Sequence, residues 1–561
     1  MSTPIIRVAD VSFTYRGRTQ PAIDALSCTL QAGSITAIIG KAGAGKSTLC
    51  ALLAGFMPQF FRGKVMGDIS VDGRNPCTSS IIDMLPHVTM VTSQASTQIS
   101  GVCFTVAEEV GFALQNLGYP VSDITQRVAR ALALMDISHL AERSPFQLSG
   151  GQQQRVVIAA ALALSPPILI LDEPTAQLDP PAVAALGETL QHLARNGQTI
   201  IVAEHHLDWV GQFAERVLVL NAGRLHADGA PDVILADPAQ ADGRAYCVRY
   251  SAFARQHDLW PRESPLAITP DAICQHIRMD ATPHPIVATP PVVGAELLHI
   301  DDAHFSYPNG VAVLHGITIR IQRGERIALL GRNGAGKSTL LRHFNGLLRP
   351  QAGRVALAGR DISKTAPGVS ARHASIVFQD VRNQLFAATI RDEVSFGPRT
   401  LGLRPTEITR RVDSALAVCG LSHLADTHPY DVPVAQRRLV ATAAVMALES
   451  DLVALDEPTA GLDEANITQL VSAMQHCHAH QRTVVLVSHD LNFCAAHTDR
   501  VILIKAGKVV IDTRWNVLDA TQIALLDSEV GLPLGLHVAQ QRGVAPGTPL
   551  HQLLCDPQAL V

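Results

Sequence analysis

The sequence has 561 residues, a formal net charge of −5 and a pI near 6.5. This length is sufficient for more than one domain, each with a hydrophobic core of its own. The slightly acidic balance argues against a nucleic-acid partner, which usually binds to a basic face. Ten cysteines occur without a CxxC pair, and this usage favours a reduced, cytosolic protein over a disulfide framework.

No secretory signal is recognisable in the sequence. The most apolar stretch, residues 156–171, is short and is broken by Pro166 and Pro167. We interpret it as a helix, a turn and a buried strand. The chain is therefore not expected to cross a membrane by itself.

The same set of motifs occurs twice along the chain. The separation is 291 residues (331 − 40) at the first matched glycines, Gly40 and Gly331. It becomes constant at 284 residues for Gln152/Gln436, Asp172/Asp456, Asp179/Asp463 and His205/His489. Self-similarity at a long, fixed spacing predicts a duplicated domain. The expected organisation is a first domain over 1–236, a linker over 237–293, a second domain over 294–515 and a tail over 516–561.

The first predicted elements are strands near 5–11 and 27–30, followed by a phosphate-binding loop. GKAGAGKST follows the apolar run SITAII, and GRNGAGKST follows ERIALL; both precede a leucine-bearing helix. Glycines in this context let backbone N–H groups face phosphates at a helix N-terminus. The pattern predicts that Lys46 and Lys337 reach the β- and γ-phosphates of ATP, and that Ser47 and Ser338 bind Mg²⁺. The expected nucleotide-binding residues are Gly40, Lys41, Ala42, Gly43, Ala44, Gly45, Lys46, Ser47, Thr48, Gly331, Arg332, Asn333, Gly334, Ala335, Gly336, Lys337, Ser338 and Thr339.

Acidic pairs end the next buried strands, in ILILDEP and VALDEP. Asp172 and Asp456 are expected to bind Mg²⁺, and Glu173 and Glu457 to polarise the attacking water. His205 and His489 follow two further apolar strands. They are candidate contacts for the γ-phosphate in the two halves, although a lone histidine at a strand end is more often structural.

One motif, which we call the signature, differs between the copies. LSGGQ at Leu148–Gln152 is matched by VPVAQ at Val432–Gln436, and both lie 20 residues before the acidic pair (172 − 152 and 456 − 436). The second copy lacks the serine hydroxyl and the glycines, and Pro433 has no N–H group. The sequence therefore indicates two unequal sites, with the alternative that VPVAQ still starts a helix that contacts phosphate.

The remaining segments carry less chemistry. Residues 281–291 are rich in proline and predict a semi-rigid spacer. The HCHAH segment at 476–480 has spacing that can bind a metal, but a solvated helix end is the ordinary interpretation. The tail after 515 has helix-compatible pieces and no recognisable chemistry.

Together these motifs resemble the ATPase subunits of ABC transporters, over nearly all of both halves. The resemblance implies an α/β fold with two tandem P-loop NTPase domains, each with a mixed sheet, a helical subdomain and an antiparallel β subdomain. It implies that Tyr15 and Tyr307 stack on adenine. It also makes Gln94 and Gln379 the Q-loop residues, which bind Mg²⁺ and water and couple them to a transmembrane partner.

Within the family, the segments at 104–118, 204–209 and 383–403 resemble energy-coupling-factor importers of vitamins or transition-metal ions. That resemblance implies a transmembrane permease, a substrate-binding membrane subunit and a peripheral position at the cytoplasmic face of the cell membrane. The pairs Glu108–Glu109 and Asp392–Glu393 are candidate exposed partners for basic residues of the permease, or else ordinary solvated charges. The cargo is not specified, because it would be recognised by other subunits.

In this family two domains close head to tail, so the resemblance sorts the residues into two composite centres. The centre expected to hydrolyse ATP combines Tyr307, Lys337, Gln379, Glu457 and His489 with Ser149, Gly150 and Gly151. The other combines Tyr15, Lys46, Gln94, Glu173 and His205 with Pro433, Val434 and Ala435. Loss of one preorganised donor can slow a reaction by about 100- to 1000-fold, so slow or absent turnover is expected there.

Two other functions use a similar architecture. A soluble tandem-ABC translation factor acting on the ribosome typically has a charged helical interdomain segment and intact signatures. The fused ATPase of a sugar importer usually loses catalytic residues from its second half. Here Glu457 and His489 are kept and one signature is degenerate, which favours the importer interpretation.

Overall fold

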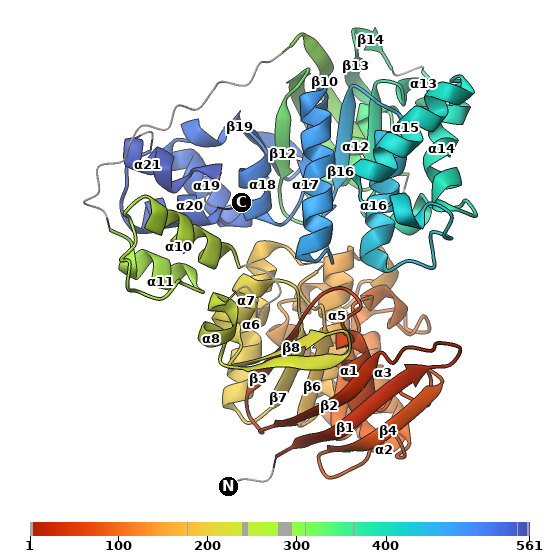
Figure 1. The fold of residues 1–561 in the computed structure, drawn as a ribbon, viewed down its shortest axis with the longest axis vertical. Helices are drawn as coiled ribbons and strands as arrows, with labels where there is room; N and C mark the ends of the chain where they lie inside the picture. Colours follow the sequence, from red (N-terminus) through yellow and green to blue (C-terminus); the bar gives the residue numbers. More distant parts are fainter. Residues whose placement is uncertain are drawn as a thin grey trace. The chain divides into compact units, whose positions relative to one another are not determined.

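The computed structural model describes residues 4–176, 178–237, 245–278, 294–308, 310–362, 365–546, 548–557 and 560. The chain divides into two compact units, Met1–Ser251 with Glu263–Ile273, and Ala252–Arg262 with Cys274–Val561. The first unit runs from red to yellow in Figure 1, and the second is mainly green to blue. Each unit is described by itself.

The first unit contains two sheets. An antiparallel sheet has the order β2-β1-β4, with β1 Ile6–Tyr15, β2 Ile23–Leu30 and β4 Gly63–Val71. A six-stranded sheet has the order β5-β6-β7-β3-β8-β9, in which only β9 is antiparallel to its neighbour. Its strands are β3 Ile35–Ile39, β5 Val88–Val91, β6 Ile168–Asp172, β7 Thr199–Ala203, β8 Arg216–Asn221 and β9 Arg224–Gly229.

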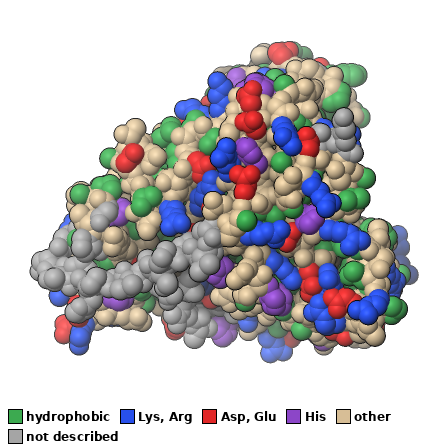
Figure 2. Space-filling view, turned by 90° about the horizontal axis from the view of Figure 1, so that it is seen from above, with side chains coloured by type: hydrophobic (Ala, Val, Ile, Leu, Met, Phe, Trp, Pro, Cys, Tyr) green, Lys and Arg blue, Asp and Glu red, His purple; other side chains and the backbone are tan. Residues whose placement is uncertain are grey.

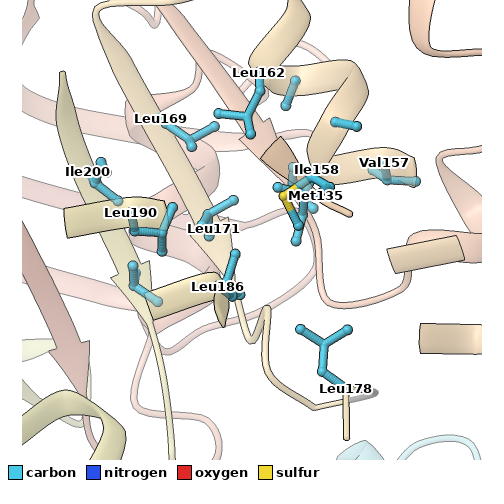
Figure 3. Close-up of a cluster of buried hydrophobic side chains, with 14 of the residues drawn as sticks. Met135, Val157, Ile158, Leu162, Leu169, Leu171, Leu178, Leu186, Leu190 and Ile200 are labelled. Atoms are coloured by element: carbon cyan, nitrogen blue, oxygen red, sulfur yellow. The ribbon is translucent and has the colours of Figure 1, made fainter. Parts of the chain in front are cut away.

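The core of this unit follows from its parallel strands. Every residue of β3, β6 and β7 is buried, as expected where both faces of a parallel sheet are covered. Alternate residues of each strand belong to two different apolar clusters. Figure 3 shows part of one cluster, with Leu169, Leu171 and Ile200 from the sheet near Leu186 and Leu190. The carboxyl ends of the strands are thereby held in fixed positions.

Helices complete the first unit. The phosphate loop leads into α1 Lys46–Leu53, and the LSGGQ motif leads into α5 Gly150–Ala163. Capping boxes start both α3 Val106–Asn116 and α5, at Thr105 and Ser149 respectively. The other helices are α2 Ile81–Met84, α4 Val121–Leu134, α6 Pro180–Arg195, α7 Leu207–Phe213 and α8 Pro231–Ala236.

The second unit repeats this architecture. Its antiparallel sheet has the order β11-β10-β13-β14, with β10 Glu296–Ser306, β11 Ala312–Gln322, β13 Ala352–Leu357 and β14 Arg360–Asp361. Its mixed sheet has the order β15-β16-β17-β12-β18-β19, which matches the first unit strand for strand. These strands are β12 Arg326–Leu330, β15 Ala374–Val377, β16 Leu452–Asp456, β17 Thr483–Val487, β18 Arg500–Lys505 and β19 Lys508–Arg514.

The helices of this unit also correspond to those of the first. They are α12 Lys337–Phe344, α13 Pro367–Ser370, α14 Ile390–Thr400, α15 Pro405–Val418, α16 Val434–Met446, α17 Glu464–Ala479 and α18 Leu491–His497. The predicted fold class, two tandem α/β domains with mixed and antiparallel sheets, is confirmed.

The expected linker and tail contain helices. Helix α10 Tyr246–Gln256 and helix α11 Pro270–His276 lie within 237–293, where the sequence analysis predicted only a connector. The N–H groups of Tyr246 and Cys247 donate to the Asp208 carboxylate at 3.0 and 2.9 Å, so α10 is attached to α7. The proline-rich spacer at 281–291 lies outside the described residues. The tail forms α19 Ala520–Val530, α20 Leu534–Gln541 and α21 Pro549–Leu554.

The structure also shows how apolar its helices are and how charge is distributed on its surface. Within the part of the chain that the structure describes, no helix is both long and apolar enough to cross a bilayer. Acidic and basic side chains are interspersed on the face shown in Figure 2. Exposed ion pairs such as Arg354–Asp361, with Nε and Oδ2 3.2 Å apart, each contribute little to stability.

Candidate nucleotide-binding centres

The two phosphate loops have the same geometry. Gly45 and Gly336 cap α1 and α12 with φ of 102° and 106°, a left-handed conformation that glycine adopts without strain. A Cβ on Gly40 would lie 2.1 Å from the carbonyl oxygen of Leu220, so this close approach also requires glycine. Each loop ends at the start of an eight-residue helix, where N–H groups and the helix dipole favour an anion.

The loop lysines are held by backbone carbonyls of their own loops. Lys46 Nζ donates to the carbonyls of Gly40 and Lys41 at 2.7 and 3.0 Å. Lys337 Nζ donates to those of Gly331 and Arg332 at 2.6 and 3.1 Å. Both lysines are therefore positioned over the loop in which phosphates are expected to lie.

A serine and an aspartate meet beside each lysine. Asp172 hydrogen-bonds Ser47, and Asp456 hydrogen-bonds Ser338. Burial, with a contribution from the neighbouring glutamate, raises the pKa of both aspartates to about 6. The Oδ1 atom of each is buried and has no hydrogen-bond partner among the described residues. A hydroxyl beside an unsatisfied buried carboxylate oxygen fits a Mg²⁺ ion, whose charge would displace the proton.

Each acidic pair ends in a glutamate with an unusual backbone. Glu173 and Glu457 have φ of 50° and 51°, a left-handed conformation that is rare for such residues. Their N–H groups donate to Ala203 and Val487 at 2.8 Å, which ties both turns to the neighbouring strand. Burial raises the pKa of Glu457 to about 7, while Lys337 opposes the rise.

The predicted histidines lie against these glutamates. His205 Nε2 is 3.0 Å from Glu173 Oε1, and His489 Nε2 is 3.3 Å from Glu457 Oε1. His489 Nε2 is also 3.1 Å from Asn333 Oδ1 of the phosphate loop. The arrangement can hold a water between a carboxylate and the terminal phosphate, while contact with the γ-phosphate stays a prediction.

The tyrosines expected at adenine contact the phosphate loops. The hydroxyls of Tyr15 and Tyr307 are 3.0 Å from those of Thr48 and Thr339. Phe13 and Phe305 pack edge-on against the two rings, with centroids 4.9 and 5.1 Å apart. Each ring therefore has a fixed orientation beside its loop.

Gln94 and Gln379 are exposed and follow the last residues of β5 and β15. The structure adds a supporting pair that the sequence analysis missed. Gln98 accepts from Thr92 N–H at 2.8 Å and donates to Met90 at 3.2 Å. Gln384 likewise accepts from Phe378 at 2.8 Å and donates to Ile376 at 2.9 Å. A second repeated glutamine in each half was the signal that could have revealed these residues.

The pairs Glu108–Glu109 and Asp392–Glu393 were expected to be exposed, and this expectation is wrong for one member of each pair. Glu109 and Glu393 are only 6% and 4% exposed. Glu109 accepts from the N–H and hydroxyl of Ser100, both at 2.7 Å. Glu393 accepts from the N–H groups of Phe386 and Ala387 at 2.8 and 2.7 Å. These carboxylates organise the segment after the Q-loop glutamine and are not available to a partner.

The two signature segments both start helices, with different caps. Ser149 caps α5 through a capping box with Gln152. Pro433 stands at the equivalent place of α16 without a side-chain cap, and Val434 is 50% exposed. VPVAQ therefore does begin a helix, but it presents a branched side chain where Gly150 stands in the first domain.

The residue just before each predicted histidine, together with that histidine, forms a segment that we call the switch, and it also differs between the two domains. Glu204, which is 2% exposed, accepts from Thr175 N–H and hydroxyl at 3.2 and 2.7 Å. It also accepts from the N–H groups of His205 and His206 at 3.0 and 3.3 Å. At the matched position the Ser488 hydroxyl is 3.0 Å from that of Thr459 and accepts from the N–H of Asp490 at 3.1 Å. Glu204 is the first residue of the segment at 204–209, and no local pattern in the sequence marks it as buried.

The HCHAH segment lies at the end of α17. The rings of His476 and His480 are in contact at a tilt of 36°, with centroids 4.3 Å apart, and His480 Nδ1 hydrogen-bonds the carbonyl of His476 at 2.8 Å. Among the described residues, no group of three or more His, Cys, Asp or Glu side chains is arranged to hold a metal ion. The metal interpretation has no support there.

Comparison with known proteins agrees with this geometry. The ABC transporter family model matches residues 23–176 and 314–460. A putative ABC transporter ATP-binding protein of Methanosarcina acetivorans is 31% identical over 529 residues, covering 91% of this chain and 86% of that protein. The chain belongs to the ABC transporter family of ATP-binding proteins. Membership implies ATP binding and ATP hydrolysis.

Two solved structures are also similar. CbiO1 of Clostridium perfringens, described as part of the ABC transporter complex cbiONQ, is 33% identical and covers 42% of this chain and 95% of that one, with a TM-score of 0.37. RNase-L Inhibitor is 17% identical and covers 92% of each chain, with a TM-score of 0.58. At that identity the second similarity shows a shared fold alone.

Proposed function

We propose that the chain is the ATP-hydrolysing subunit of an importer of the energy-coupling-factor type, with one hydrolysing and one ATP-retaining centre. The observation that carries the proposal is the pairing of two complete phosphate loops with one intact signature. The cargo would be a vitamin or a transition-metal ion. The partners would be a transmembrane permease and a substrate-binding membrane subunit.

In the proposed hydrolysing centre, the second domain supplies most groups and the first supplies Ser149, Gly150 and Gly151. Lys337 would neutralise phosphate charge, and Ser338 with Asp456 would hold Mg²⁺, which adds further charge neutralisation when bound. Glu457 would orient the attacking water and His489 would fix the water and phosphate relative to that carboxylate. The groups from the second domain are held in place by their own hydrogen bonds, so they would need little reorganisation during the reaction.

In the proposed retaining centre, the first domain binds ATP through Lys46, Ser47, Asp172 and Tyr15. The segment facing it would be Pro433–Ala435, which supplies no hydroxyl and a bulky Val434. Preorganised donors to the developing charge are therefore fewer. ATP would bind and help the domains close, while its hydrolysis would be slow.

The permease would bind beside the two Q-loop segments. Phe104 is 83% exposed and Phe386 is 65% exposed, just before α3 and α14. Phe386 packs edge-on against Phe396, with centroids 4.7 Å apart. Large apolar side chains that stay in water mark candidate protein contacts. Both follow the Q-loop glutamines, which is the place where the family receives its membrane partner.

The two rival functions are weaker. The similarity to RNase-L Inhibitor extends to the fold alone, whereas a relative with 31% identity over 91% of this chain is named as a transporter protein. For a sugar-importer ATPase, loss of residues from the second half would be expected. Glu457 and His489 instead occupy the same arrangement as their first-domain counterparts.

The test is recovery of the tagged full chain from native membranes. The wild-type chain should sediment with membranes and co-purify with integral membrane proteins. The double variant Phe104→Ser/Phe386→Ser should lose at least about tenfold of this association, since each buried aromatic contributes about 1.5–3 kcal/mol. The control is Val233→Ser/Val517→Ser, which removes one exposed apolar residue from each unit at other elements. Recovery on ribosomes with no membrane pool would refute the transport function.

A further inference from the structure

The turn at Glu457 has a second restraint that comes from the helix that starts at VPVAQ. Arg438 Nη1 donates to the carbonyl oxygen of Glu457 at 2.7 Å. The N–H of the same residue donates to Val487 at 2.8 Å. Both polar groups of this left-handed residue are thus held, from α16 on one side and from β17 on the other. A charged donor makes the first of these the stronger hydrogen bond.

Arg438 also lies near the Q-loop. Its positive charge acts on the carboxylate of Asp380, the residue after Gln379. Helix α16 packs against the short helix η4, Val381–Asn383, that follows Asp380. Arg438 therefore joins α16 to the turn at Glu457 by a hydrogen bond, and its charge also acts on Asp380, whose direct partner is Arg382.

The first domain has different residues at the two matched positions. The residue matched to Arg438 at the constant separation of 284 is Gln154 (438 − 284). Gln154 is 1% exposed, and neither its amide nitrogen nor its oxygen has a hydrogen-bond partner among the described residues. The residue after Gln94 is Ala95, where the second domain has Asp380. Both charged groups are therefore confined to the second domain.

We propose that Arg438 is a positioning residue for Glu457, and that through it the start of α16 and the Q-loop control hydrolysis at the second domain's centre. The inference rests on the proposed function, in which this centre performs the turnover. It adds a physical route from the degenerate signature, at the N-terminus of α16, to the hydrolysing carboxylate. Binding of ATP at the retaining centre would then change the position of Glu457 without any direct contact between two ATP molecules.

The test compares four variants of the full chain in the complex isolated from native membranes. Arg438→Gln installs the first-domain residue, and Arg438→Lys keeps the charge. Arg437→Gln is the matched control, because Arg437 donates to Val432 and Tyr430 at 3.0 and 2.8 Å and does not bond Glu457. Glu457→Gln reports whether the centre is the one that turns over. Each variant is measured for kcat, for KM and for ATP binding.

Arg438→Gln should lower kcat by about 10- to 100-fold, the range expected for loss of one hydrogen bond to a charged group. KM should change less than about twofold, because the phosphate loop is untouched. Arg438→Lys should recover part of kcat, and Arg437→Gln should behave as wild type. Thermal unfolding of each variant separates loss of folding from loss of positioning.

Three results would overturn the inference in distinguishable ways. If Glu457→Gln is inactive but Arg438→Gln retains the wild-type kcat, Arg438 has no positioning role and the proposed function survives. If Glu457→Gln retains turnover, the assignment of the hydrolysing centre fails and the inference fails with it. A fall in kcat that is equal in Arg437→Gln and Arg438→Gln would show a general effect of the helix start, and would also refute the specific role.

Discussion

The two nucleotide centres share their phosphate chemistry and differ in what surrounds it. The lysines, the serine–aspartate pairs and the left-handed glutamates occupy matching positions in both domains. The differences lie at the signature, at the switch, where Glu204 replaces Ser488, and one turn into the signature helix, where Gln154 replaces Arg438. Under the proposed function, the lysines and the serine–aspartate pairs bind ATP and Mg²⁺, whereas turnover needs the glutamate together with the groups that differ. The proposed function therefore has one centre of the duplicated domain lose hydrolysis and still bind ATP.

The largest expected effect comes from the two matched glutamates. Glu457→Gln should lower steady-state ATPase activity of the assembled complex by about 100-fold or more, since general-base assistance contributes about 10²–10⁴-fold. Glu173→Gln should cost only a few fold. The substitution has the same size and shape in both domains, so each variant is the control for the other. Equal losses would mean that VPVAQ supports catalysis or that the two centres hydrolyse ATP only together. The asymmetric assignment would then be withdrawn.

A smaller effect is expected at the switch of the first domain. Glu204 joins Thr175 to His205 and His206 through four hydrogen bonds. Glu204→Ser, which installs the second-domain residue, leaves several buried donors unsatisfied, at about 1–3 kcal/mol for each such group. The loop after Glu173 and the switch histidine would then move independently. We expect ATP to leave the first centre several-fold faster.

The measurement is release of a fluorescent ATP analogue, with Lys337→Ala present to weaken binding at the second centre. Glu204→Gln keeps one acceptor oxygen and should be intermediate. Ser488→Glu is the reciprocal change. Release from the first centre at the wild-type rate in Glu204→Ser would show that this carboxylate serves folding alone.

Short motifs made much of this comparison predictable from the sequence. The phosphate loops, the acidic pairs and the start of α16 depend on residues that are close in the chain, and they form where the sequence predicted. The helices α10 and α11 were not predicted, because no motif or strong periodicity in the sequence marks them. Their placement depends on long-range contacts such as Asp208 with Tyr246.

Burial was the other property that the sequence did not reveal. Glu109 and Glu393 look like exposed acidic residues in the sequence, yet each is buried by a chain reversal that brings Ser100 or Phe386 back to its carboxylate. Glu204 and Arg438 belong to the same class. Each of these charged residues is held by a partner from 7 to 29 residues away, and no short motif encodes that partner.

The smallest predicted difference concerns acid stability. His343 of α12 is fully buried, and its Nδ1 bonds the carbonyl of Thr339 at 2.8 Å while Nε2 has no partner within the described residues. Burial lowers the pKa of this histidine. At the matched separation of 291 the first domain has Leu52 (343 − 291).

The sign of the effect follows from proton linkage. The unfolded chain binds a proton at His343 near the ordinary histidine pKa of about 6.5, whereas the folded domain resists protonation until lower pH. This contribution to stability is fully present above about pH 6.5 and is lost as pH falls toward the folded-state pKa. His343→Leu should therefore reduce the acid sensitivity of the second domain. Pulse proteolysis at pH 7.5 and 5.5 can follow the unfolding of each domain separately. In thermal unfolding, a change of 1 kcal/mol in stability corresponds to about 2–4 °C in Tm for a domain of this size. An identical pH dependence in the variant and the wild type would show that another group, such as the buried His551, causes any acid lability.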